Sequence, residues 1–237
     1  RLQKIMLSGS RITGIPTGFT DLDGRLSGLQ PSDLILIAAR PSMGKTAFAL
    51  NIAQYAAIRN SHCTAVFSLE MSKEQLAERI LSNVSKVPLL NLRDGAYMKE
   101  HVDEIERVFD AFEELSDTPL TIDDTGSASL YEIKSRARIA VQKGCKVVFI
   151  DHLQLIQGTN SYRGNRVQEV SEISRQLKGL ARELNIPIVL LSQLSRQVEM
   201  RAEKRPQLSD LRDSGAIEQD ADSVLMLWRE KYYDSEA

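Results

Sequence analysis

The stretch ARPSMGKT, residues 39–46, decides the fold of this chain. It follows the apolar run of residues 34–38 and leads directly into an amphipathic pattern that predicts a helix over residues 46–59. A strand, a tight loop ending in Gly-Lys-Thr and a helix, in this order, predict a phosphate-binding loop. In such a loop, backbone N–H groups surround phosphate oxygens at the positive end of the helix.

The side chains of this loop have distinct expected tasks. Lys45 supplies a point charge to the outer phosphates of a nucleotide, and the Thr46 hydroxyl is placed to bind Mg²⁺. The usual motif begins with Gly, where this chain has Ala39, but the order of strand, loop and helix is kept. The residues expected to contact the nucleotide are Ala39, Arg40, Pro41, Ser42, Met43, Gly44, Lys45 and Thr46.

Apolar strand-like runs alternate with amphipathic helical patterns along the whole chain. The predicted strands are residues 34–38, 64–68, 120–122, 147–150, 188–192 and 224–228. Capping boxes at Ser72 with Gln75 and at Ser129 with Glu132 predict two helix starts. Apolar stripes predict two more helices, one at Val102, Ile105, Val108, Phe109, Phe112 and Leu115, the other at Val167, Val170, Ile173, Leu177, Leu180 and Leu184. The pattern indicates an α/β fold with a mostly parallel sheet covered by helices on both faces.

Polar residues follow three of the predicted strands, at the edge where such sheets bind ligands. Asp151 ends the run VVFID and is expected to bind Mg²⁺ as a Walker B carboxylate. Glu70 follows the second strand, where it faces the γ-phosphate and activates water or, alternatively, is only an acid favoured at a helix N-terminus. Gln193 either senses the γ-phosphate or is a plain polar residue at a strand end. His152, beside Asp151, is expected to have a structural, hydrogen-bonded role.

Length and composition place this chain with globular proteins of one main domain. It has 237 residues, a net charge of −2, 42% hydrophobic and 26% charged residues. No apolar run approaches the roughly 18 residues of a membrane span, and the start lacks the apolar stretch of a signal peptide, so we expect a cytoplasmic protein without a membrane partner. The first residue is Arg, which suggests a piece of a longer protein. Residues 1–12 are expected to end a linker, and residues 13–237 to form one nucleotide-binding domain.

The distribution of charge indicates where nucleic acid could bind, and the cysteine content indicates the state of the thiols. Residues 94–124 are strongly acidic and are expected to repel nucleic acid, whereas basic residues gather between residues 158 and 214. The cluster there either contacts a phosphate backbone or consists of solvated loop charges; it comprises Arg196, Arg201, Lys204, Arg205 and Arg212. Cys63 and Cys145 suit neither a disulfide framework nor a zinc site and are expected to be reduced thiols beside buried strands.

Six strings, in order, extend these motifs over nearly the whole chain: ITGIPTGFTDLD, ARPSMGKT, FSLEMS, VVFIDHLQLI, IVLLSQLSR and KRPQLSDLRDSGAIEQDAD. Together they resemble the RecA-like motor domain of replicative DNA helicases of the DnaB type. The resemblance implies a P-loop ATPase that forms a homohexameric ring, translocates on single-stranded DNA and unwinds duplex DNA at the replication fork. It also implies contacts with primase and a helicase loader.

The resemblance assigns roles to residues of this sequence. Lys45 and Thr46 would contact the phosphates and Mg²⁺, Glu70 would be the catalytic glutamate, and Asp151 the Walker B acid. Gln193 would couple the nucleotide to DNA. The loop lining the ring channel would contain Arg212, Asp213 and Gly215, where many members have Glu in place of Asp213; Arg201 and Arg205 are further candidates for DNA contact.

Two parts of the family pattern are expected outside the sequence. A helical N-terminal domain would precede the linker, and a basic finger that reaches the neighbour's γ-phosphate would follow Ala237. Arg229 precedes the expected place of that finger and is not assigned its role. Two other functions share the nucleotide motifs: a RecA-like recombinase, which would form filaments on DNA, and a nucleotide-gated scaffold without motor work.

Overall fold

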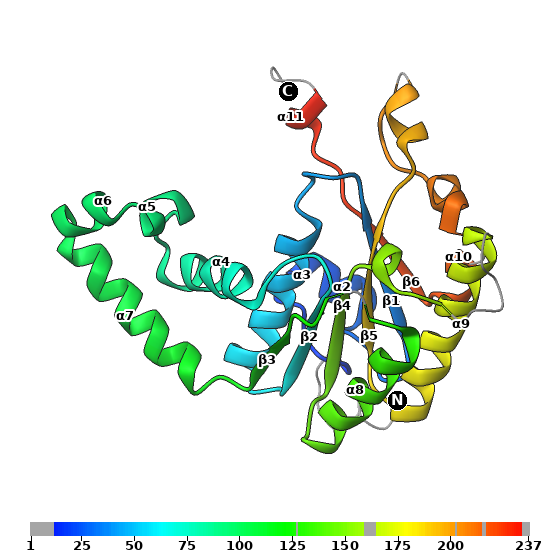
Figure 1. Ribbon diagram of the computed structural model, residues 1–237, viewed down its shortest axis with the longest axis horizontal. Helices are drawn as coiled ribbons and strands as arrows, with labels where there is room; N and C mark the ends of the chain where they lie inside the picture. Colours follow the sequence, from blue (N-terminus) through cyan, green and yellow to red (C-terminus); the bar gives the residue numbers. More distant parts are fainter. Residues whose placement is uncertain (1–11, 127, 159–164, 202, 215–216, 234–237) are drawn as a thin grey trace.

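The computed structural model describes residues 12–126, 128–158, 165–201, 203–214 and 217–233, with the side chains of residues 212–214 left undescribed. Its centre is a six-stranded sheet, every strand pair of which is parallel (Figure 1). The strands run in the order β3-β2-β4-β5-β1-β6. Their bounds are β1 Leu34–Ala39, β2 Thr64–Ser68, β3 Leu120–Asp123, β4 Val147–Asp151, β5 Ile188–Gln193 and β6 Ser223–Met226.

Helices connect the strands and cover both faces of the sheet. The longer ones are α3 Lys45–Gln54, α4 Lys73–Ser85, α7 Val102–Ser116, α8 Leu130–Gln142 and α9 Arg166–Leu184. The shorter ones are α2 Thr20–Leu26, η1 Tyr55–Arg59, α5 Leu89–Arg93, α6 Gly95–Glu100, η2 Leu153–Leu155, η4 Arg196–Met200, η5 Leu208–Ser214, α10 Ile217–Asp220 and α11 Glu230–Tyr233. None of the helices among the described residues has the length and apolar character to cross a membrane.

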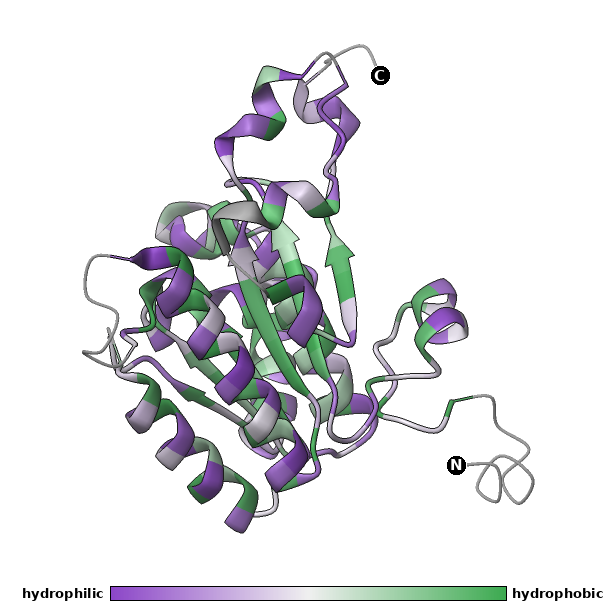
Figure 2. Ribbon diagram, turned by 90° about the vertical axis from the view of Figure 1, so that its right-hand side faces the viewer, coloured by the Kyte–Doolittle hydropathy of each residue, from purple (hydrophilic) through white to green (hydrophobic). Residues whose placement is uncertain are grey.

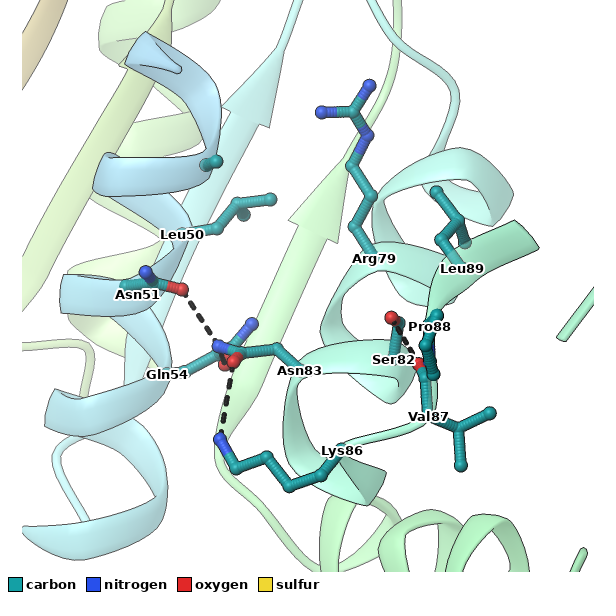
Figure 3. A pocket seen from close by; sticks show the side chains of 11 residues that line it. Leu50, Asn51, Gln54, Arg79, Ser82, Asn83, Lys86, Val87, Pro88 and Leu89 are labelled. Atoms are coloured by element: carbon teal, nitrogen blue, oxygen red, sulfur yellow. Dashed lines mark hydrogen bonds between the residues drawn. The ribbon is translucent and has the colours of Figure 1, made fainter. Parts of the chain in front are cut away.

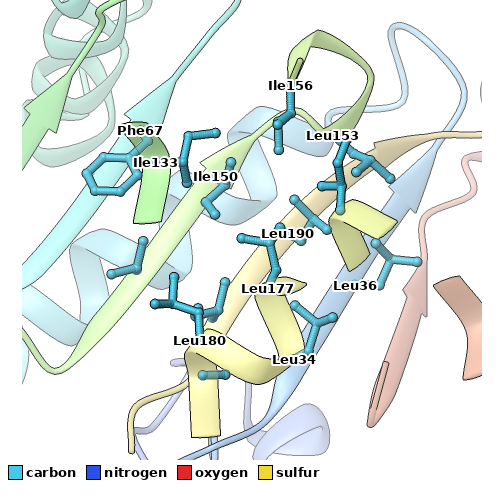
Figure 4. Packing of buried hydrophobic residues seen from close by; sticks show 14 of the residues in the cluster. Leu34, Leu36, Phe67, Ile133, Ile150, Leu153, Ile156, Leu177, Leu180 and Leu190 are labelled. Carbon is cyan, nitrogen blue, oxygen red and sulfur yellow. The ribbon is translucent and has the colours of Figure 1, made fainter. Parts of the chain in front are cut away.

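Two apolar layers sandwich the sheet because alternate residues of each buried strand point to opposite faces. In β1, Leu34 and Leu36 face the layer under α8 and α9, while Ile35 and Ile37 face the layer under α3 and α4. Figure 4 shows the first layer, where side chains of β1, β4 and β5 meet those of α9. In Figure 2 the strands are mostly apolar, and the helices carry polar residues. The buried strands explain the continuous apolar runs in the sequence.

The predicted α/β fold is confirmed. All six predicted strands form, with ends that differ by one or two residues, and the helix α9 covers the stripe that begins at Val167. Both predicted capping boxes are present: the Ser72 and Ser129 hydroxyls accept from the backbone N–H groups of Gln75 and Glu132, whose side chains accept from the cap N–H groups. The sequence therefore marks these helix starts directly.

Three elements differ from the sequence expectation. The predicted helix 46–59 is α-helical only to Gln54 and continues as the π-helix η1. The turn-rich segment before β1 contains the short helix α2, held by a hydrogen bond of 2.8 Å from the Thr17 N–H to the buried Asp23. On α7, the predicted apolar stripe forms but is only partly covered. Leu115 packs against the apolar layer under α3 and α4, whereas Val102, Phe109 and Phe112 are 59%, 66% and 62% exposed.

The two cysteines, both free thiols, lie beside each other at the edge of the sheet where β2 and β4 begin. Cys145 is buried and Cys63 half-buried, and both contact the apolar layer under α8 and α9. Lys146 N–H donates to the Cys63 carbonyl at 2.7 Å, which holds the two segments together. Burial, with the neighbouring Cys63 thiol, raises the pKa of Cys145 to about 12. Their expected position beside buried strands is confirmed.

Candidate functional site

The phosphate loop lies between the end of β1 and the start of α3. Gly44 is the N-cap of α3 and has a φ of 90°, a left-handed conformation that glycine adopts without strain. Ser42 is also left-handed, with a φ of 66°. These two residues turn the chain so that Lys45 begins the helix, whose unpaired N–H groups and dipole favour an anion at this end.

Asp151 joins this loop from the neighbouring part of the sheet. It ends β4 and is buried, and its Oδ2 accepts a hydrogen bond of 2.6 Å from Thr46 Oγ1. Lys45 Nζ lies 3.5 Å from Asp151 Oδ1. Burial lowers the pKa of Lys45, and the carboxylates of Asp151 and Glu70 oppose that shift. The sheet therefore brings a hydroxyl, an ammonium and a carboxylate together at one edge, as the sequence predicts.

Glu70 lies at the same edge, two residues after β2. Its carboxylate oxygen Oε2 is 2.9 Å from His152 Nδ1, a hydrogen-bonding distance without the ideal direction. The side chain of Glu70 is 55% exposed, whereas that of His152 is 9% exposed. Burial, and next the charge of Lys45, lowers the pKa of His152, so the ring is neutral near pH 7. The structure thus supplies the partner of His152 that the sequence does not reveal.

A divalent cation fits this group of side chains. One ligand atom each of Glu70, Asp151 and His152 lies within 4.8 Å of the others. Asp151 Oδ1 is buried and accepts no hydrogen bond from the described residues, which leaves a carboxylate oxygen for a cation. Mg²⁺ prefers oxygen ligands and keeps several waters, so Asp151 and Thr46 are the side chains that could hold it beside a nucleotide.

A cleft of about 430 Å³ contains the phosphate loop and its partners. Glu70 and Gln193 line it together with loop residues, and Gln193 is fixed at the end of β5 by a hydrogen bond of 3.1 Å from its N–H to Gln154 Oε1. Arg79 of α4 also lines the cleft, and the sequence reasoning missed it. Arg79 lies seven residues, or about two helical turns, after the cap Ser72, so the capped start of α4 beside Glu70 was the available signal.

A second cavity, of about 460 Å³, lies between α3 and α4 and shares Arg79 with the cleft (Figure 3). Its floor is a group of amides: Asn83 Nδ2 donates to Asn51 Oδ1 and to Gln54 Oε1, both at 2.8 Å. The two hydrogen bonds connect α3 to α4. They therefore fix Arg79 relative to the phosphate loop.

The predicted DNA-contact residues lie in the segment that follows β5. Arg201 forms an ion pair with the buried Asp210 and donates to the Arg205 carbonyl at 3.2 Å, so its guanidinium is already paired within the chain. Arg205 is exposed and lies over the Trp228 ring, 5.8 Å from its centroid. The backbone of Arg212 and Asp213 belongs to η5, but their side chains and the whole of Gly215 lie outside the described residues.

Curated relatives match most of this chain. Replicative DNA helicase DnaC of Bacillus subtilis (strain 168) is 51% identical over 226 residues, which cover 95% of this chain and 49% of the relative. Replicative DNA helicase DnaB of Geobacillus stearothermophilus is 51% identical over 227 residues, with coverage of 95% and 49%. The chain therefore spans about half the length of these relatives.

Solved structures give the same assignment. One of them, described as an ATPase domain, has a TM-score of 0.94 and 39% identity, covering 100% of this chain and 83% of that one. "The Structure Of A DnaB-Like Replicative Helicase And Its Interactions With Primase" has a TM-score of 0.93 and 39% identity, covering 100% and 56%. The family model for the DnaB-like helicase C-terminal domain matches residues 14–237. With a matching sheet, a matching family model and relatives half identical, this chain belongs to the DnaB-like helicase C-terminal domain family.

Proposed function

We propose that this chain is the ATP-hydrolysing motor domain of a replicative DNA helicase, which forms a homohexameric ring on single-stranded DNA and unwinds the duplex at the fork. The observation that carries the proposal is the meeting of Lys45, Thr46, Asp151 and Glu70 at one sheet edge in a chain of this family. Residues 13–237 would form this motor domain, and residues 1–12 would end the linker that precedes it.

The residues at this edge of the sheet have separate roles in ATP hydrolysis. Backbone N–H groups of residues 40–46 and the Lys45 ammonium bind the phosphates of ATP. Thr46 and Asp151 would hold Mg²⁺, which would supply positive charge beside the phosphate oxygens. Glu70 accepts a proton from water as that water attacks the γ-phosphorus and ADP leaves.

His152 and Gln193 act around this step. The neutral imidazole of His152, 2.9 Å from Glu70, limits the positions of the carboxylate and leaves it free to take a proton. Gln193 ends β5 beside the phosphate loop, and the predicted DNA segment begins directly after it. An uncharged amide in this place hydrogen-bonds to a γ-phosphate oxygen and loses that bond on hydrolysis.

The proposed function also includes contacts with DNA and assembly into a ring, which involve residues outside the ATP site. Phosphates of single-stranded DNA would meet Arg212, Asp213 and Gly215 in the ring channel, with Arg201 and Arg205 near them. A cation from the neighbouring subunit would complete each ATP site; in known systems such a cation contributes about 10³–10⁵ in rate. The apolar side chains exposed on α7 support assembly, because large exposed apolar patches mark interaction surfaces.

Primase and a helicase loader are further proposed partners. The name of one similar structure mentions a DnaB-like replicative helicase and its interactions with primase, at 39% identity to this chain. The loader follows from family resemblance alone.

Electron microscopy of the full-length protein with ATP and single-stranded DNA tests the assembly. Closed six-membered rings on DNA support the helicase, whereas long helical filaments favour a recombinase. Turnover measured with and without DNA separates a motor from a nucleotide-gated scaffold, because a scaffold has no need of DNA-stimulated hydrolysis. A protein that neither forms rings nor responds to DNA would contradict the proposal.

A further inference from the structure

Arg40 is a charged residue of the phosphate loop whose side chain is almost fully buried. Its relative exposure is 7%, and a buried guanidinium requires partners for its charge and donors. Nη1 donates to the Leu194 carbonyl at 2.8 Å, and Nε donates to Glu199 Oε1 at 2.9 Å. Both partners lie in the segment that follows β5, more than 150 residues away in the chain.

A backbone contact strengthens the same junction. The Leu194 N–H donates to the Ala39 carbonyl at 3.0 Å, directly before Arg40. The first two residues of the phosphate loop therefore hold the segment after β5 through a main-chain bond, a side-chain bond to a carbonyl and an ion pair. A charge-assisted hydrogen bond of this kind also fixes direction, because the donors of arginine form a rigid planar fork.

The held segment continues to the predicted DNA loop through the buried Asp210. The Ser195 N–H donates to the Asp210 carbonyl at 3.1 Å, and the Gln207 N–H donates to Asp210 Oδ2 at 2.7 Å. Arg201, one residue after η4, pairs with the same carboxylate. Asp210 lies in η5, two residues before Arg212. A continuous set of hydrogen bonds thus runs from the start of the phosphate loop to the helix that carries the predicted DNA contact.

We infer that Arg40 and Glu199 are positioning residues that couple the nucleotide site to the DNA-binding segment. The inference rests on the proposed function and adds a second connection beside Gln193. Nucleotide binding orders the phosphate loop, and Arg40 transmits its position to η4 and, through Asp210, to η5. Breaking the Arg40–Glu199 pair weakens this transmission while leaving the phosphate contacts of Lys45 and Thr46 intact.

The test compares nucleotide-dependent DNA binding in the full-length protein. Dissociation constants for a single-stranded oligonucleotide are measured without nucleotide and with a non-hydrolysable ATP analogue, and their ratio reports the coupling. Glu199→Gln is expected to bring this ratio closer to one by about threefold or more, since substitutions along a coupling network change the coupling by that order. Analogue affinity without DNA should stay within about twofold, because Glu199 lines no part of the cleft.

Glu203→Gln is the matched control, an exposed acid of the same segment with no ion pair or hydrogen bond to the part of the chain described. It should leave the ratio unchanged. Arg40→Lys should also bring the ratio closer to one. Adding Glu199→Gln to it should change the ratio little further, because both substitutions act on the same Arg40–Glu199 ion pair. Unfolding temperatures of all variants establish that they are folded.

The outcomes distinguish a failure of the coupling role from a failure of the proposed helicase function. If the wild-type ratio is far from one, two results overturn the coupling role: an unchanged ratio in Glu199→Gln, or fully additive effects of the two substitutions. Either result leaves the helicase function standing. A wild-type ratio of one contradicts both.

Discussion

Thr46 and Asp151, 105 residues apart in the chain, are joined by a hydrogen bond of 2.6 Å between the start of α3 and the end of β4. The bond connects the residue expected to offer a hydroxyl to Mg²⁺ with the residue expected to offer a carboxylate. The adjacent Asp151 Oδ1 is buried and accepts no hydrogen bond from any described residue. The sheet itself therefore brings together the two side chains that are expected to hold Mg²⁺.

Glu70→Gln should slow ATP hydrolysis by about 10²–10⁴-fold and leave nucleotide affinity nearly unchanged, because the amide cannot accept the proton of the attacking water. The measurement is steady-state turnover beside titration with a fluorescent ATP analogue. Glu74→Gln, an exposed acid in the first turn of α4, is the control and should retain turnover. Near-normal hydrolysis by Glu70→Gln would remove Glu70 from the catalytic role.

Lys45→Ala should abolish turnover together with tight nucleotide binding, since it removes the charge that faces the outer phosphates. Thr46→Ala should instead raise the Mg²⁺ concentration needed for half-maximal turnover, because it removes one of two protein contacts of the ion. A Mg²⁺ titration of each variant distinguishes these effects. An unchanged Mg²⁺ requirement in Thr46→Ala would place the ion elsewhere.

Arg212→Ala in the full-length protein should weaken single-stranded DNA binding without sequence bias and reduce its salt dependence. Each lost phosphate contact reduces the slope of log affinity against log salt by roughly 0.7 for single strands. Arg175→Ala, on an exposed position of α9, is the control. If Arg212→Ala changes neither slope nor affinity, the contact moves to Arg205, whose guanidinium is exposed beside Trp228.

Cys145 should resist alkylation in the folded protein. Its pKa is raised to about 12, so at pH 8 about one thiol in 10⁴ is a thiolate. The raised folded pKa stabilises the protein below the pKa of the unfolded thiol, and this contribution falls as the pH rises from about 9 toward 12. Mass spectrometry after iodoacetamide treatment should find Cys63 labelled first and Cys145 labelled only on unfolding. Equal labelling of both in the native protein would contradict the burial of Cys145.

The sequence predicts the sheet and the phosphate loop well because both depend on local patterns. Buried parallel strands require uninterrupted apolar runs, and the side chains of Ser72 and Ser129 mark helix starts within three residues. The placement of Asp151 and Glu70 could be predicted for the same reason, since both residues follow strands that end at one edge of the sheet. These features need no knowledge of distant contacts.

Other features depend on contacts between distant residues and give no local signal. In the sequence, nothing distinguishes Arg40 from other loop residues, because its partners Leu194 and Glu199 come close to it only in the folded chain. The pairing of His152 with Glu70, and of Arg201 with Asp210, arises in the same way. The stripe on α7 predicts a helix correctly but not its exposure, because periodicity does not say what covers the apolar face.

Strand separation by the full-length protein is the decisive measurement of the proposed motor function. The substrate is a forked DNA duplex with one labelled strand, incubated with ATP and Mg²⁺, and the release of that strand is followed over time. The proposed motor function predicts ATP-dependent release that is absent in Lys45→Ala and strongly slowed in Glu70→Gln. DNA-stimulated ATP hydrolysis without release of the strand, or release that persists in Lys45→Ala, would contradict it.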